Sequence, residues 1–109
     1  MPAKTVEPER MRAQNSGLLL NLIWQERSVS RAELARRTGL SKAMIGELIG
    51  ELVSTELVRD SGASDSAAGK TSMLSFRDDA FVIVGIELAV DWVHVVVTDL
   101  RGHVRTMRH

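Results

Sequence analysis

The chain lacks cysteine altogether, and aromatic residues make up only 4% of its 109 positions. Without cysteine there are no disulfide bonds and no thiolate metal sites, which suits a reducing cytoplasm. Long hydrophobic runs are also missing, because the longest (residues 18–20 and 81–86) fall far short of the roughly 20 apolar residues of a membrane helix. The polar N-terminus has no apolar signal core. We therefore expect a soluble cytoplasmic protein with no membrane partner.

An excess of charge of one sign is missing as well. Lys and Arg together number 14, as do Asp and Glu, so the formal net charge is zero. Because many DNA-binding domains are strongly basic, this total argues against a nucleic-acid partner. The distribution of charge argues for one, since residues 31–42 carry a local charge of +3. That charge comes from Arg31, Arg36, Arg37 and Lys42 against Glu33.

What the sequence does contain is helical periodicity, in a composition that is 44% hydrophobic and typical of globular proteins. Residues 9–26 are predicted to form a first helix, because apolar residues recur at the i, i+3, i+4 spacing. Pro8 is acceptable just before this helix or at its first turn. The predicted core-facing stripe consists of Leu18, Leu19, Leu22 and Ile23.

A short second helix is predicted after Ser30. Ser30 and Glu33 have the spacing of a capping box, in which the hydroxyl accepts from the Glu33 amide and the carboxylate reaches back. Leu34 and Ala35 supply a narrow apolar face. Gly39 stands where a left-handed residue would end the helix.

A third helix is predicted over residues 41–56, with Ser41 as its cap. Its apolar stripe is complete and consists of Ile45, Leu48, Ile49, Leu52 and Val53. A short helix, a turn with glycine and a longer helix have the spacing of a helix-turn-helix. Leu34, Ala35, Leu40, Ile45 and Leu48 are expected to hold the two helices together. Because such a pair cannot bury its own apolar surface, the first helix is expected to cover it.

Residues 57–59 and 73–76 are predicted strands on either side of a loop, residues 61–72, that is rich in Ser, Ala and Gly. Directly after a helix-turn-helix, two such strands are typical of the wing of a winged helix. A flexible linker is the alternative for residues 61–72.

From residue 81 onward the pattern favours β-structure. Residues 81–88 and 92–98 are predicted strands, and residues 99–102 form a turn into a third strand at 103–106. A sheet this small with two apolar faces is not stable alone in water. We therefore predict an α+β chain with a winged helix-turn-helix domain at 9–76 and an incomplete β-meander at 80–109.

Several segments together resemble the N-terminal part of ROK-family regulators (repressors, open reading frames and sugar kinases). These are SRAELARRTGLSKAMIGELIGELVSTELV, a wing ending in Gly69-Lys70, VIVGIEL and VVVTDLRGHV. The resemblance implies a winged-helix domain on an actin-like (ribonuclease H-like) sugar-binding domain, of which this chain holds only the first strands. It also implies binding to a double-stranded DNA operator, usually as a homodimer. A sugar or sugar-phosphate effector is implied only where the C-terminal domain is present.

The resemblance does not extend to catalysis or to metal binding. ROK kinases have a phosphate loop of the type Asp-x-Gly-x-Thr after the first strand, but this chain has Ala89 in place of the glycine and no threonine follows. The resemblance places the zinc-binding cluster of the family downstream of residue 109. Residues 1–109 are not expected to bind zinc in that way, because there is no cysteine and the histidines (His94, His103, His109) have no paired spacing. We expect no catalytic residue, no metal and no cofactor.

The helix at 41–56 is the expected recognition helix in the major groove, and the wing at 61–72 is expected on the DNA backbone. The predicted DNA-binding residues are Ser30, Arg31, Ser41, Lys42, Ala43, Met44, Gly46, Glu47 and Lys70. Together these features predict a transcriptional regulator, a repressor of sugar-metabolism genes. The alternatives are a winged helix that binds another protein without binding DNA, and the remnant of a ROK sugar kinase.

Overall fold

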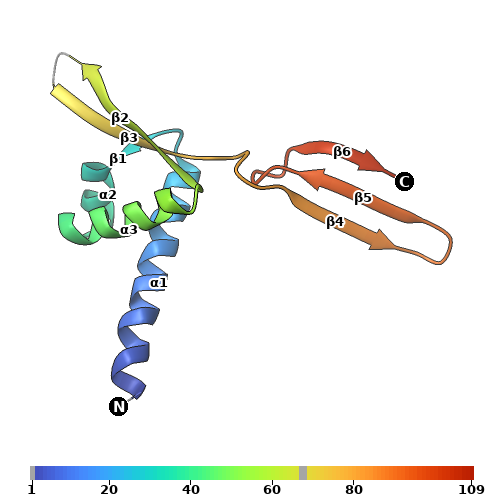
Figure 1. Cartoon of the computed structure of the whole chain (residues 1–109), viewed down its shortest axis with the longest axis horizontal. Coiled ribbons are helices and arrows are strands. Elements are labelled where there is room, and N and C mark those ends of the chain that lie inside the picture. Colours follow the sequence, from blue (N-terminus) through green and yellow to red (C-terminus); the bar gives the residue numbers. More distant parts are fainter. Residues whose placement is uncertain (1, 67–68) are drawn as a thin grey trace. The chain divides into compact units, whose positions relative to one another are not determined.

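Apolar residues spaced three and four apart build the helices of the computed structural model, which describes residues 2–66 and 69–109, with the side chains of residues 8–62 and 72–109. In this part of the chain the helices are α1 (Pro2–Gln25), α2 (Arg31–Thr38) and α3 (Lys42–Ser54). The chain divides into two compact units, Met1–Phe76 and Arg77–His109. The strands of the first unit are β1 (Val29–Ser30), β2 (Val58–Ser66) and β3 (Gly69–Phe76), and those of the second are β4 (Ile83–Leu88), β5 (Val93–Thr98) and β6 (Val104–Arg108) (Figure 1).

Both ends of α2 are capped as the sequence predicts. The hydroxyl of Ser30 accepts a hydrogen bond from the Glu33 amide at 3.1 Å, and Gly39 ends the helix at φ +75°. The second half of the predicted capping box is wrong, because the Glu33 carboxylate accepts from Arg36 at 3.0 Å instead. Ser30 itself belongs to β1 and is paired with Met73.

One hydrophobic cluster joins the helices to the sheet in the first unit. The cluster contains buried side chains from all three helices and from the sheet, and Val53 of the predicted α3 stripe is only partly buried. The buried residues are Leu19, Ile23, Leu34, Ile45, Leu48, Ile49, Leu52, Val29, Val58 and Leu74. Ala35 and Leu40 pack against it and are partly buried. The predicted contact between α2 and α3 is therefore confirmed, and α1 packs against α3 and β3, crossing α3 at a steep angle (Figure 1).

Two predictions for α1 are wrong. The helix begins at Pro2 rather than at residue 9, and Pro8 lies inside it. The fixed φ of proline is compatible with a helix, so the cost is a missing N–H donor and local crowding rather than a complete break. Leu18 is 44% exposed, whereas Leu19 is fully buried. Of the predicted stripe, Leu19, Leu22 and Ile23 contact the cluster and Leu18 does not.

The wing is longer than the sequence predicts. β2 and β3 pair antiparallel from Val58↔Phe76 to Ser66↔Gly69, so most of the predicted loop at 61–72 is strand. Pairing through backbone hydrogen bonds needs no large side chains, which is why Ser, Ala and Gly permit it. A register shift follows Asp60, and there Gly62 has φ +75°. β3 pairs with β1 as well, which gives the sheet order β1-β3-β2.

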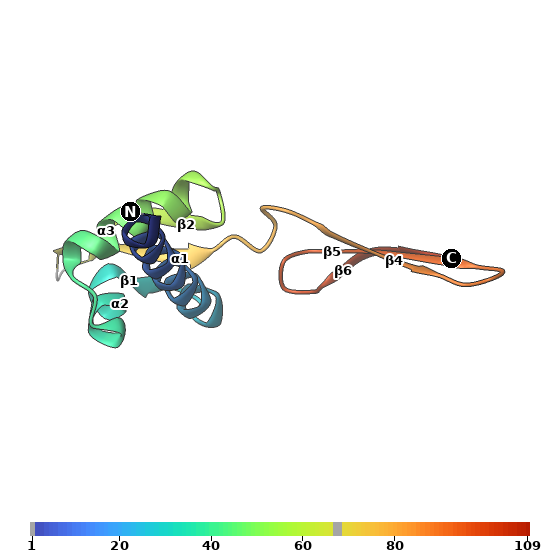
Figure 2. The ribbon, with the colours of Figure 1, turned by 90° about the horizontal axis from the view of Figure 1, so that it is seen from below.

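The second unit is the predicted meander, with strand order β4-β5-β6. Figure 2 shows these strands edge-on as a single layer. Many of its large apolar side chains are exposed, among them Val84, Ile86 and Met107. Its buried group is a carboxylate, that of Asp99, which accepts from the backbone amides of Arg101 and His103 at 2.9 Å each. Backbone pairing and this turn hold the unit together.

No helix in the described part of the chain has the length and apolarity to cross a membrane.

Three glycines allow a test of the backbone conformations. A Cβ at Gly17, Gly50 or Gly39 would meet no atom within 4 Å, but only Gly39 has a positive φ. We expect Gly17→Ala and Gly50→Ala each to raise the free energy of unfolding by about 0.5–1 kcal/mol, because alanine restricts the unfolded chain and favours a helix. Gly39→Ala serves as the control and should lower it by about 1–2 kcal/mol. Urea unfolding measures all three, and a common direction of change would contradict these backbone assignments.

Candidate nucleic-acid interface

The first turns of α3 present small and polar residues outward. Ser41 caps the helix with φ −68° and ψ 157°, and its hydroxyl accepts from the Met44 amide at 3.1 Å. The opposite side of the helix is buried in the hydrophobic cluster. Of the residues predicted to contact DNA from this helix, those exposed are Ser41, Lys42, Ala43, Gly46 and Glu47. Gly46 leaves open space around the backbone, since a Cβ there would meet nothing within 4 Å.

Met44 differs from the prediction that it belongs to the open reading face. Its side chain is half-buried and packs against the hydrophobic cluster. Together with residues of α1, including Met11 and Asn15, it lines a groove. The reason is its position, one residue before Ile45 and four before Leu48, which places it at the boundary between the buried and exposed sides. Contact between Met44 and a thymine methyl stays a prediction.

Ion pairs offset most of the local positive charge of residues 31–42. Arg36 pairs with Glu33 within α2, and its hydrogen bond lowers the pKa of the Glu33 carboxyl. Arg37 pairs with Glu26 at 2.9 Å. Among the residues whose side chains the structure describes, Lys42 has no carboxylate partner within 4.0 Å. Lys42 is therefore the cation of this segment that remains available to an anion.

Lys42 and Arg31 come together where α2 and α3 both begin. The two side chains line one small hollow with Ala32 and Ile45. The side chain of Arg31 is 38% exposed. The corner formed by Arg31 and Lys42 owes its free positive charge to Lys42 and to the dipoles of the two helices, because Arg31 is paired with Asp60.

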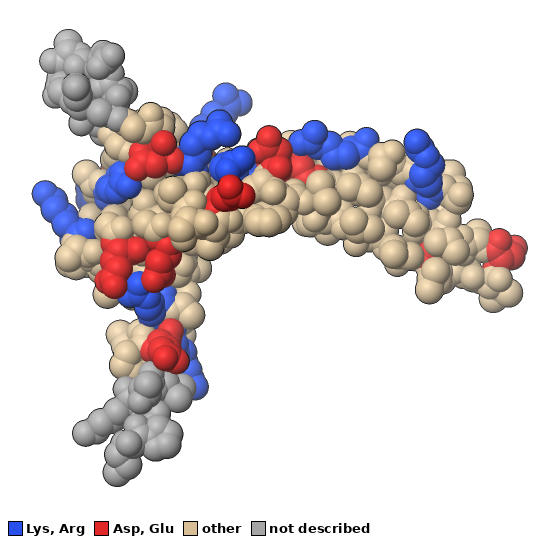
Figure 3. Space-filling view, viewed as in Figure 1, with Lys and Arg blue, Asp and Glu red and all other residues tan. Residues whose placement is uncertain are grey.

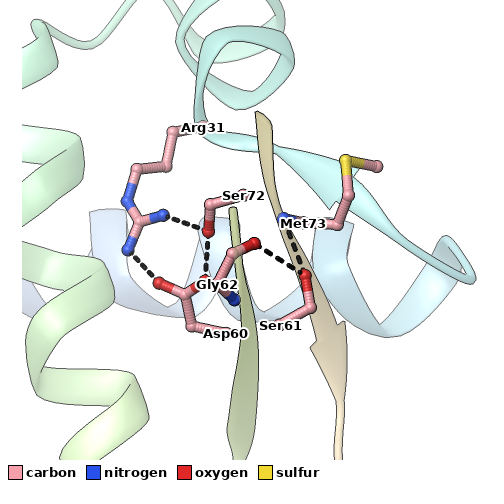
Figure 4. A network of polar contacts seen from close by, with 6 residues as sticks. All are labelled: Arg31, Asp60, Ser61, Gly62, Ser72 and Met73. Atoms are coloured by element: carbon pink, nitrogen blue, oxygen red, sulfur yellow. Dashed lines mark hydrogen bonds and ion pairs between the residues drawn. The ribbon is translucent and has the colours of Figure 1, made fainter. Parts of the chain in front are cut away.

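Arg31 also ties α2 to the wing (Figure 4). Its Nη2 donates to Asp60 Oδ2 at 2.7 Å and its Nη1 donates to Ser72 Oγ at 3.0 Å. Asp60 accepts further hydrogen bonds from Ser72 and from the Gly62 amide. The hydrogen bond from Ser72, followed by that from Arg31, lowers the pKa of Asp60 from 3.8 to about 2. Arg31 thus fixes the base of the wing, a role that the sequence did not indicate.

Two other predicted residues contribute in different ways. The Ser30 hydroxyl is occupied by the cap of α2. Lys70 lies in β3, opposite Asp65, but its side chain is outside the part that the structure describes. The place of a kinase phosphate loop is taken by a tight turn between β4 and β5, where the Ala89 amide donates to the Trp92 carbonyl at 2.9 Å.

The carboxylates of α3 are paired with a residue that sequence reasoning missed. Arg12 of α1 donates to Glu51 and also lies 3.2 Å from Glu47, measured from Nη1 to Oε1. The hydrogen bond to Glu51 is the chief cause of the raised pKa of Arg12. Acidic side chains gather over α3 in Figure 3, with basic ones beside them. No short-range pattern could have revealed this pairing, because it joins residues 35 and 39 positions apart along the sequence.

The sequence is similar to bacterial repressors along most of its length. It is 33% identical over 96 residues to the xylose repressor of Bacillus spizizenii and 35% identical over 89 residues to that of Bacillus subtilis. The matches cover 87% and 81% of this chain but 25% and 23% of the relatives, so the chain spans about a quarter of their length. These relatives are named as repressors and not as enzymes. No protein-family model matches the chain.

The fold is similar to that of a solved regulator. A crystal structure of a ROK family transcriptional regulator, a homologue of the E. coli MLC protein, matches with a TM-score of 0.74 at 20% identity. The match covers 90% of this chain and 25% of that one. At this identity the likeness shows the fold alone, and it confirms the predicted α+β class.

The wing base gives a prediction about pH. Asp60 has a lower pKa when folded than its ordinary 3.8, so its ionised form stabilises the fold fully above about pH 4, and this contribution is lost as the pH falls toward 2. We expect Asp60→Asn to lower the free energy of unfolding by about 1–2 kcal/mol at neutral pH, with the difference shrinking as the pH falls through that window. Thermal unfolding over pH 2–7 measures it, with the exposed Asp79→Asn as control. A deficit that stays constant down to about pH 2 would contradict the role of the ionised carboxylate.

Proposed function

We propose that this chain belongs to the ROK family of transcriptional regulators and is the DNA-binding part of a repressor of sugar-metabolism genes. The observation that carries the proposal is that the outward side of α3 is exposed and bears mostly small side chains. It lies beside the corner formed by Lys42 and Arg31. In a winged helix this surface has the size and position to enter the major groove of double-stranded DNA.

Contacts to the DNA backbone would come from the start of α3 and from the wing. The exposed end of the helix, with its positive dipole and Ser41, suits a phosphate. Lys42 is placed for a second phosphate or for the O6 and N7 atoms of guanine. Lys70 is our candidate for the backbone contact of the wing, and Ser30 and Arg31 would support this arrangement from the start of α2.

Base reading would fall to the middle of the outward surface. Ala43 and Gly46 have so little side chain that the helix backbone can approach the base edges closely. The carboxylate of Glu47, which is 58% exposed, is suited to accept a hydrogen bond from cytosine N4. Because cations with a free charge are scarce here, we expect weak and salt-sensitive binding by the isolated chain.

The sugar response would belong to the longer polypeptide. We infer that residues 80–109 begin the actin-like sugar-binding domain and that the full-length protein acts as a homodimer. Since the relatives are named as xylose repressors, a sugar or sugar phosphate is the effector class that we propose.

A second candidate function has a specific observation in its favour. Glu47 and Glu51 add negative charge to α3, and ion pairs occupy Arg36 and Arg37. A winged helix that binds another protein through α3 would show the same features.

Selection from a random pool of DNA duplexes separates these two candidates. We expect the chain to enrich one sequence motif, arranged with two-fold symmetry where two copies bind, and to retard that duplex in an electrophoretic shift assay. Raising the salt concentration should weaken the complex steeply. Recovery of no common motif, with a folded chain by circular dichroism, would overturn the DNA-binding proposal and leave the protein-binding one.

Two lysine variants test the docking. Lys42→Ala should lower affinity for the selected site about fivefold or more and change the preferred base beside it. Lys70→Ala should weaken binding to every duplex alike and reduce the slope of log affinity against log salt by about 0.9.

Arg105→Ala provides the matched control, because it removes an equal charge from the second unit. If Lys42→Ala left both affinity and base preference unchanged, α3 would not enter the groove as described.

A further inference from the structure

Among the residues whose side chains the structure describes, Arg12 is the residue of α1 that contacts the exposed carboxylates of α3. Glu47 and Glu51 stand one helical turn apart, and their side chains are 58% and 55% exposed. Arg12 is only 33% exposed, and its Nη1 and Nη2 reach one carboxylate each. A single guanidinium from another helix therefore bridges two acidic groups on the surface proposed to face DNA.

Without Arg12 these carboxylates would oppose DNA binding. Like charges at i and i+4 repel each other on a helix, and phosphates would repel both. One bound guanidinium reduces the local charge of the pair from −2 to −1. It also restrains two flexible side chains, because the planar fork of arginine holds carboxylates in a defined direction.

The geometry also bears on base reading. Arg12 approaches Oε1 of Glu47. A carboxylate has two oxygens and about four acceptor positions, so Oε2 remains able to accept from the amino group of a base. A carboxylate held in one orientation discriminates between base edges better than one that moves freely, since less conformational entropy is lost on binding.

We propose that Arg12 is a positioning residue of the DNA interface, which orients Glu47 toward an amino group in the major groove and offsets the charge of Glu47 and Glu51. This inference rests on the proposed function and extends it to a helix outside the helix-turn-helix. Arg12 acts through the carboxylates and makes no phosphate contact of its own.

A set of variants tests this role. Dissociation constants are measured for the selected duplex and for duplexes altered at each base pair, with Arg12→Gln, Glu47→Gln, Glu51→Gln and their combinations. We expect Arg12→Gln to weaken binding about threefold to fivefold and to relax preference at the same base pair as Glu47→Gln. In the Glu47→Gln, Glu51→Gln double variant, the further change Arg12→Gln should have no effect.

Arg12→Lys separates charge from orientation. Lysine keeps the positive charge but lacks the planar fork, so we expect affinity to recover and base preference to stay relaxed. Arg10→Gln is the matched control, because it removes an equal and exposed charge two residues away on α1 and should leave both measures unchanged. Thermal unfolding of every variant confirms that binding is compared between folded proteins.

Three results would overturn the proposal. A loss from Arg12→Gln that persists in the double variant, with a salt slope lower by about 0.9, would mean a direct phosphate contact. A lower Tm with unchanged base preference would mean that Arg12 only joins two helices. Failure of the wild-type chain to select any duplex would overturn the DNA-binding function as well. Because the wild-type chain is measured first, this failure is distinguished from a failure of the role proposed for Arg12 alone.

Discussion

Burial of Leu34 is the constraint on which the helix-turn-helix depends. It is the one buried side chain of α2, a helix of 8 residues whose side chains are all described. A helix this short is not stable in isolation. Its attachment rests on Leu34 in the cluster, the hydroxyl of Ser30 at one end and the left-handed Gly39 at the other. The angle between α2 and α3, and therefore the corner shared by Arg31 and Lys42, follows from these three residues.

Local features of both units were predictable because their causes are local. Caps, glycine turns and the spacing of apolar residues are encoded within a few positions, and α2, α3 and the meander match them. What sequence reasoning missed depends on distant partners. β1 exists because it pairs with β3, more than 40 positions away, and the wing is long because its two strands support each other. A propensity pattern contains no information about such pairs.

The same division holds for the candidate site. The exposed residues at the start of α3 and the boundary position of Met44 follow from helical periodicity, whereas the groove that Met44 lines with α1 depends on a distant partner. The sequence also suggested a basic segment, but it could not show that carboxylates of α2, of β2 and of Glu26, which directly follows α1, neutralise most of it. Composition counts charges, and the fold decides which of them remain available. A chain of zero net charge can therefore present a free cation, Lys42, at the start of α3.

The two units are stabilised by different kinds of interaction, and this has a calorimetric consequence. The buried hydrophobic cluster lies within residues 19–74, whereas the buried group of the second unit is the Asp99 carboxylate. The heat-capacity increment of unfolding arises from apolar surface that becomes hydrated, and the apolar side chains of the β4-β5-β6 layer are largely hydrated already. By calorimetry this chain therefore resembles a smaller protein than its length suggests. The enthalpy that its final third absorbs on melting comes mainly from ladder hydrogen bonds.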